Sequence, residues 1–151
     1  CVCVCVCVCV WVVWGRVAAV VVTKYVREKG GSALGRTAED LKSIETAIGM
    51  YKAKNGSWPA EVAQTVTPAG VETYFKGPVP LAKPCPIGGV YDYDAPSGGS
   101  PAMISIRSVV GNAFTAQSAA DLDTHFDDGV ATTGAVRVPS ATQITFTLGA
   151  E

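Results

Sequence analysis

The sequence predicts an α+β protein in which a long hydrophobic N-terminal helix continues into an amphipathic helix that packs on a small antiparallel sheet. Three observations lead to this fold class. The first 22 residues contain a single charged side chain, Arg16. Apolar residues recur at intervals of three and four between positions 41 and 51, which is the period of an amphipathic helix. Four short runs of alternating or β-branched residues between positions 90 and 148 are typical of strands.

The length and charge of the chain limit its organisation. Its 151 residues are enough for one compact domain and an appendage. The formal net charge of −1 excludes a basic nucleic-acid-binding surface as the main feature, so we expect no nucleic-acid partner. We divide the chain into a hydrophobic transmembrane or filament-core helix at 1–29, a flexible joint at 30–36 and a globular head at 37–151.

The N-terminal segment has the length of a membrane span, for which about 20 apolar residues are needed. A single apolar segment in lipid must satisfy its own backbone hydrogen bonds, which favours a helix. Because this helix would be apolar on all sides, lipid and further copies of itself can bury it equally well. The residues expected to form its buried surface are Val10, Trp11, Val12, Val13, Trp14, Val17, Val20 and Val21.

Cysteine and valine alternate strictly over residues 1–10. Several interpretations stay open: a low-complexity tract without chemical meaning, a lipid-modified Cys1, and metal or redox chemistry. Thiolate sites need a defined spacing and supporting contacts, which argues against the last of these. A sixth cysteine, Cys85, lies alone in the head, so no disulfide can form within the head.

The amphipathic helix is expected over residues 37–55, after a joint marked by Gly30-Gly31-Ser32. Thr37 is the expected N-cap, with Asp40 placed for a capping-box contact. Asn55-Gly56 is the expected stop. The apolar face of the helix consists of Leu41, Ile44, Ile48 and Tyr51.

The head should contain two strand pairs. Residues 58–88 are rich in proline, so we expect an ordered loop over the helix. Residues 90–93 and 103–107 should form a hairpin, and residues 135–138 and 144–148 a second pair. One face of the last run carries Ile144, Phe146 and Leu148. Four aromatic residues are expected to pack in the core: Trp58, Phe75, Tyr91 and Tyr93.

Several segments resemble the type IV pilin-like family. Residues 15–25, GRVAAVVVTKY, resemble the latter half of the N-terminal helix of that family. Residues 40–59 look like the end of the same helix in the major pseudopilins of type II secretion systems. Residues 74–80 and 89–94 are similar to the loop and the first strand of these pseudopilins. The fold implied by the resemblance is pilin-like.

The resemblance implies a non-enzymatic structural subunit of a helical filament, either a pseudopilus or a pilus. Such a protein is cleaved and methylated at its N-terminus, here Cys1, and is held in the inner membrane. Secretion or pilus assembly machinery then packs it with further copies of itself into a periplasmic or extracellular filament. One departure concerns the acidic residue that the family carries near the start of the mature helix, because no Asp or Glu precedes Glu28. The unpaired Cys85 favours a pseudopilin over the pilins that have a C-terminal disulfide.

Four aspartates lie within eight residues before Gly129, namely Asp121, Asp123, Asp127 and Asp128. Carboxylate oxygens are hard ligands, and a cation would relieve the repulsion among them. The secretion pseudopilins that the chain resembles bind calcium in a C-terminal loop. Two interpretations stay open for this acidic segment, a calcium site and a solvated loop, and we expect no other cofactor.

No catalytic arrangement is evident, since His125 stands alone and the usual nucleophile and phosphate-binding motifs are missing from the sequence. We therefore predict no catalytic residues. The alternative to a filament subunit is a membrane-anchored surface lipoprotein or binding module acylated at Cys1. A redox or conductive role of the cysteine tract is a third hypothesis, based on thiol density alone.

Overall fold

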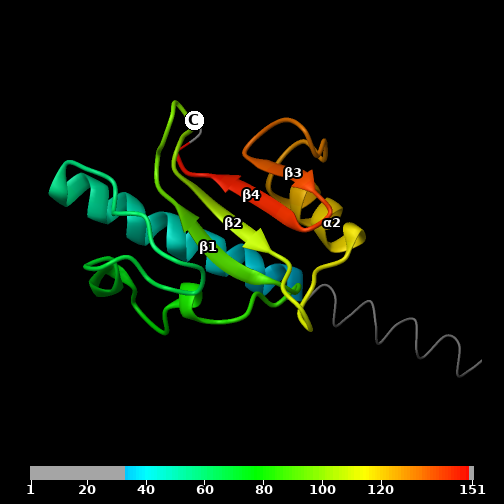
Figure 1. Ribbon diagram of the computed structural model, residues 1–151, viewed down its shortest axis with the longest axis horizontal. Helices are drawn as coiled ribbons and strands as arrows, with labels where there is room; N and C mark the ends of the chain where they lie inside the picture. Colours follow the sequence, from blue (N-terminus) through cyan, green and yellow to red (C-terminus); the bar gives the residue numbers. More distant parts are fainter. Residues whose placement is uncertain (1–32, 150–151) are drawn as a thin grey trace, which may run out of the picture. The chain divides into compact units, whose positions relative to one another are not determined.

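A long helix lies against one face of a four-stranded antiparallel sheet in the computed structural model, which describes residues 33–149 (Figure 1). The described part of this helix covers residues 33–55. The elements that follow are the 3-10 helices η1 (Glu72–Tyr74) and η2 (Pro80–Ala82), the strands β1 (Val90–Asp94) and β2 (Met103–Arg107), the helix α2 (Ala116–Phe126), and the strands β3 (Val136–Ser140) and β4 (Gln143–Thr147). The α+β fold class is thereby confirmed.

The sheet joins the two predicted strand pairs in the order β1-β2-β4-β3. Both pairs are antiparallel hairpins, and β2 pairs with β4 between them. Register places Tyr91 opposite Ile106, and Ile106 opposite Ile144, so apolar residues share one face of the sheet. The register of β3 with β4 shifts between Arg137 and Ser140. The four strand predictions are confirmed to within two residues.

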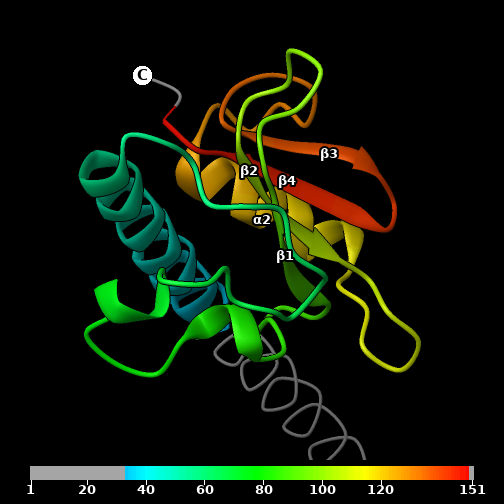
Figure 2. The same ribbon diagram turned by 60° about the vertical axis from the view of Figure 1, so that its left-hand side comes forward.

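One continuous core lies between this apolar face and the two helices (Figure 2). Leu41, Ile44 and Ile48 of the long helix are fully buried, as the apolar spacing predicts. Helix α2 contributes Leu122, also fully buried, and the ring of Phe126 meets that of Phe146 edge to face at 5.3 Å. The apolar faces of the helices and of the strands, which the sequence pattern predicts one by one, therefore form a single core.

The long helix begins earlier than predicted. Residues 33–36 are helical, so the predicted joint is wrong over these positions, while 30–32 lie outside the described residues. Thr37 is fully buried inside the helix and its hydroxyl donates to the carbonyl of Ala33 at 3.0 Å. It cannot cap a helix start from there, because its hydroxyl is turned back along the helix. Asp40 likewise accepts from the Tyr91 hydroxyl, at 3.1 Å, rather than forming a capping box.

The predicted end of the long helix is confirmed. Gly56 adopts a positive φ of 74°, and its N–H donates to the carbonyl of Lys52 at 2.8 Å. Only glycine, and less readily Asn or Asp, takes this left-handed conformation at low cost. The helix consequently stops at Asn55. Residues 58–88 form an irregular stretch with two 3-10 turns, which contacts the helix through the rings of Tyr74 and Tyr51 and contacts β1 through Thr65 and Tyr91.

Helix α2 was not predicted, because the sequence interpretation treated its second half as an acidic loop. Thr115 is its N-cap, and the Thr115 hydroxyl accepts from the N–H of Ser118 at 3.1 Å. The buried side of the helix carries Ala119, Leu122 and Asp123. A buried aspartate and a small alanine weaken the apolar periodicity on which recognition of a helix depends.

Within residues 33–149, no helix is both long and apolar enough to cross a membrane.

We predict that the head loses stability on the alkaline side through Tyr93. Burial, followed by the nearby Glu61 and Tyr51, raises the pKa of Tyr93 to about 12. Since an unfolded tyrosine has a pKa near 10, the folded state favours the neutral phenol, and this contribution is lost as pH rises from about 10 to about 12. Urea denaturation at several pH values across this range should show that the free energy of unfolding falls less steeply with pH for Tyr93→Phe than for wild type. Parallel curves would contradict the prediction.

Candidate functional site

The predicted filament-core residues, from Val10 to Val21, lie outside the residues that the structure describes, and so does Cys1. The head alone therefore provides the geometry of candidate sites. Two groups of carboxylates stand out in it.

The first group lies where α2 ends and contains three of the four predicted aspartates. Ligand oxygens of Asp123, Asp127 and Asp128 all lie within 4.8 Å of one another. Asp121 is not part of the group, which corrects the predicted set of four. It lies on the exposed side of α2, where its Oδ1 accepts from Nε2 of Gln117 at 2.8 Å. A helix separates residues 121 and 123 onto different sides, whereas the expected loop would not.

Asp127 shapes the loop between α2 and β3. Its N–H closes the last turn of α2 on the carbonyl of Asp123 at 2.8 Å. Its Oδ2 accepts from the N–H groups of Ala135 and of Val136, the latter at 3.3 Å. Gly134 permits this approach, because a Cβ on it would lie 1.6 Å from the same oxygen. The carboxylate therefore ties the end of the helix to the start of β3.

Asp128, the next residue, stabilises the same loop through contacts within it. Its Oδ1 accepts from the Val130 N–H at 2.8 Å, and its Oδ2 accepts from the Thr133 hydroxyl at 2.7 Å. The hydrogen bond from Thr133, and then that from Val130, lower the pKa of Asp128 below its ordinary value. Asp128 is therefore an exposed carboxylate that stays charged at neutral pH.

Asp123 differs from both neighbours. Its side chain is only 1% exposed, and neither carboxylate oxygen has a hydrogen-bond partner among the described residues. Burial, followed by Asp128 and Asp127, raises the pKa of Asp123. A buried charge without a partner is costly, and a hard divalent cation would offset the cost while taking carboxylate oxygens as ligands. The three aspartates thus have the composition of a calcium site.

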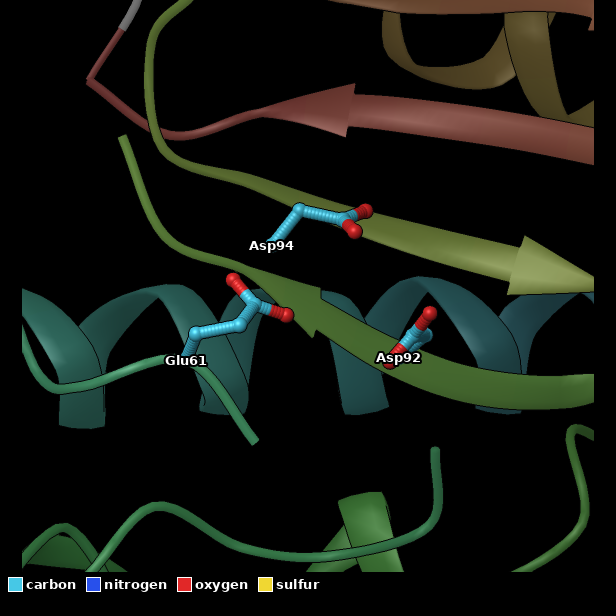
Figure 3. Close-up of side chains that lie close together, drawn as sticks. All are labelled: Glu61, Asp92 and Asp94. Carbon is cyan, nitrogen blue, oxygen red and sulfur yellow. The ribbon is translucent and has the colours of Figure 1, made fainter. Parts of the chain in front are cut away.

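The second group, Glu61, Asp92 and Asp94, was missed by sequence analysis (Figure 3). Asp92 and Asp94 alternate with Tyr91 and Tyr93 along β1, so they share the face of the sheet opposite the core. This alternation could have placed the two aspartates side by side. Glu61 comes from the preceding loop, where nothing in the sequence indicates its position.

A cation of the protein already pairs with two of the three carboxylates of this second group. The Arg107 Nε lies 2.6 Å from Oδ2 of Asp92, and Nη2 of Arg107 lies 3.2 Å from Oδ1 of Asp94. Glu61 accepts from the N–H of Ala95. Burial and the nearby Asp94 raise the pKa of Asp92, and Arg107 opposes them. The group serves as a clamp that fastens the loop before β1 to the sheet.

The sequence matches no family model and no curated protein. Among solved structures, the chain is similar to the major type IV pilin PilA1 from Clostridium difficile, with a TM-score of 0.54 and 18% sequence identity. The match covers 79% of this chain and 96% of that chain. The chain has a type IV pilin-like fold. This confirms the predicted pilin-like fold.

Of the remaining candidate residues, the aromatics and Cys85 belong to the packing of the pilin-like head, whereas His125 is exposed. Tyr91 and Tyr93 are fully buried, and Trp58 and Phe75 pack against the core, which confirms the interpretation of these aromatics. Cys85 is a buried free thiol, with its Sγ 3.6 Å from the Thr37 hydroxyl. His125 lies beside Phe126 on α2, with ring centroids 5.5 Å apart.

We predict that Arg107→Ala lowers the free energy of unfolding of the pilin-like head by about 3 kcal/mol. The substitution leaves Asp92, whose side chain is 9% exposed, without its cation. Urea denaturation measures the effect. The matched control is Arg137→Ala on β3, where the arginine is exposed and forms no ion pair with a described residue. Its cost should be about 0.5 kcal/mol or less, and an equal loss in both variants would contradict the clamp.

Proposed function

We propose that the chain is a structural subunit of a helical type IV pilin-like filament. The observation that carries the proposal is the combination of a pilin-like head with an N-terminal segment whose first 22 residues contain one charge. Such a segment needs burial on all sides, and further copies of the same segment supply it. The head decorates the outside of the filament, and the partner is the chain itself.

The same segment accounts for two locations of the subunit. Before assembly, residues 1–29 anchor it in the inner membrane. Assembly machinery of a secretion or pilus system then transfers the segment from lipid to the filament core, which becomes periplasmic or extracellular. Contacts between different surfaces of successive copies generate a helical fibre when the rotation from one copy to the next does not close a ring.

We infer more narrowly that the filament is the pseudopilus of a type II secretion system. Two features support this: the group of three aspartates, for which we propose calcium binding below, and the lack of a disulfide in the described head. A long surface pilus is the second candidate, favoured by the similarity to a major type IV pilin. Deletion of the coding sequence separates the two: a pseudopilin mutant retains exported enzymes inside the cell envelope, whereas a pilin mutant loses surface fibres in electron micrographs.

The proposal predicts an N-methylated terminus on the native protein and fibres formed by the full chain. Mass spectrometry of the N-terminal peptide and electron microscopy of the assembled protein measure these properties. A thioether-linked diacylglycerol on Cys1, together with no fibres, would instead establish the surface lipoprotein. Replacing the five tract cysteines with alanine provides a control, since the fibre needs the apolar character of the tract and not its thiols.

We further propose that Asp123, Asp127 and Asp128 bind calcium. The buried, unpartnered Asp123 supports this, and bound calcium stabilises the head because the unfolded chain lacks the site. At a hundredfold excess over Kd the gain is about 2.7 kcal/mol. Thermal melting with calcium and with chelator should show a higher Tm with calcium in wild type and no difference in Asp123→Asn. The control Asp121→Asn should keep the difference, and equal melting of wild type in both buffers would contradict the site.

A further inference from the structure

A groove runs between the exposed side of the long helix and the segment around η1. Its volume is about 280 Å³, and it is lined by Lys42, Ser43, Thr46, Met50, Tyr74 and Lys76. Met50 is 47% exposed, and the partly buried ring of Tyr74 lies in the same groove. The ion pairs among residues 33–149 all belong to Arg107, so neither groove lysine has an ionic partner there. The groove thus offers an apolar floor with two unpaired cations, which suits an apolar side chain flanked by carboxylates.

The chain itself carries such a group. Four large hydrophobic side chains are strongly exposed in the described part, namely Met50, Val66, Val110 and Val130. Of these, Val130 follows Asp127-Asp128-Gly129 directly, in the loop after α2. The loop region would keep a negative charge with a metal bound, because a divalent cation on three aspartates leaves one negative charge and the exposed Asp121 adds another. The loop is therefore complementary to the groove in charge and in apolar character.

The two surfaces cannot meet within one copy. Figures 1 and 2 both show the loop between α2 and β3, in orange, on the opposite side of the head from the segment around η1, in green. We propose that the groove binds the loop of residues 127–130 of a second copy of this chain. This contact joins two different surfaces, so each copy accepts the loop of one neighbour and offers its own loop to another, as a helical fibre requires. The proposal rests on the proposed filament and names the contact between its heads.

Site-specific photo-crosslinking of the full chain in cells tests the contact. A benzophenone amino acid in place of Met50 should attach to a second copy within residues 108–137, which trypsin releases as one peptide because no Lys or Arg lies between Arg107 and Arg137. The same probe in place of Val130 should attach to residues 43–52 of a second copy. Val66 provides the control, since it is also 47% exposed but lies outside the groove. A probe at Val66 should not yield the 108–137 adduct.

Charge reversal tests the role of the two lysines. Lys42→Glu with Lys76→Glu should lower the crosslinking yield at least about tenfold, because like charges would then face each other across the contact. Lys52→Glu with Lys83→Glu changes the net charge equally outside the groove and should leave the yield within about twofold of wild type. Equal yields in the two double variants, or adducts at other peptides only, would overturn the contact.

The outcomes separate this contact from the filament. Fibres without either adduct would overturn the contact and leave the filament in place. Both adducts without fibres would support the contact and contradict the filament. The absence of adducts and fibres would overturn both proposals.

Discussion

The head depends on how one helix covers two tyrosines of β1. Tyr91 and Tyr93 are completely buried, and a buried phenol needs a hydrogen-bond partner. Asp40 of the long helix accepts from Tyr91, and the carbonyl of Pro59 accepts from Tyr93 at 3.3 Å. A shift of the helix along the sheet would leave a hydroxyl without an acceptor. These two bonds therefore determine the position of the helix and the course of the chain that follows it.

Side chains alternate between the two faces of β1, so the same strand also organises the face of the sheet opposite the core. The residues that alternate with the tyrosines point away from the core, and there Asp92 and Asp94 both pair with Arg107. Glu61 from the loop joins them through the N–H of Ala95. One five-residue strand thus contacts the helix on one side and the loop on the other, while α2 and β4 complete the same core.

The sequence predicted the elements that have a regular apolar period, and it failed where a single polar contact determines the local structure. The strands and the apolar side of the long helix follow directly from residues such as Ile44 and Ile144, whose spacing matches their burial. The predicted start of the helix was wrong because the sequence does not distinguish a threonine buried inside a helix, such as Thr37, from a threonine that caps one. Helix α2 was missed because Asp123 interrupts its apolar side, yet this same residue makes the aspartate group a candidate cation site. Glu61 could not be foreseen, since its place depends on a loop fixed by tertiary contacts.

The strand order leaves β1 and β3 as the two edges of the sheet, and other parts of the chain pair with some of the backbone groups on each edge. The N–H of Thr65 donates to the carbonyl of Tyr91 at 3.0 Å, so the loop covers β1. On β3, Val138 donates to Ala131 at 2.8 Å, and Pro139 has no N–H at all. These contacts and the proline disfavour edge-to-edge pairing of one head with another. In the filament that we propose, recognition between copies would consequently rest on side chains rather than on strand pairing.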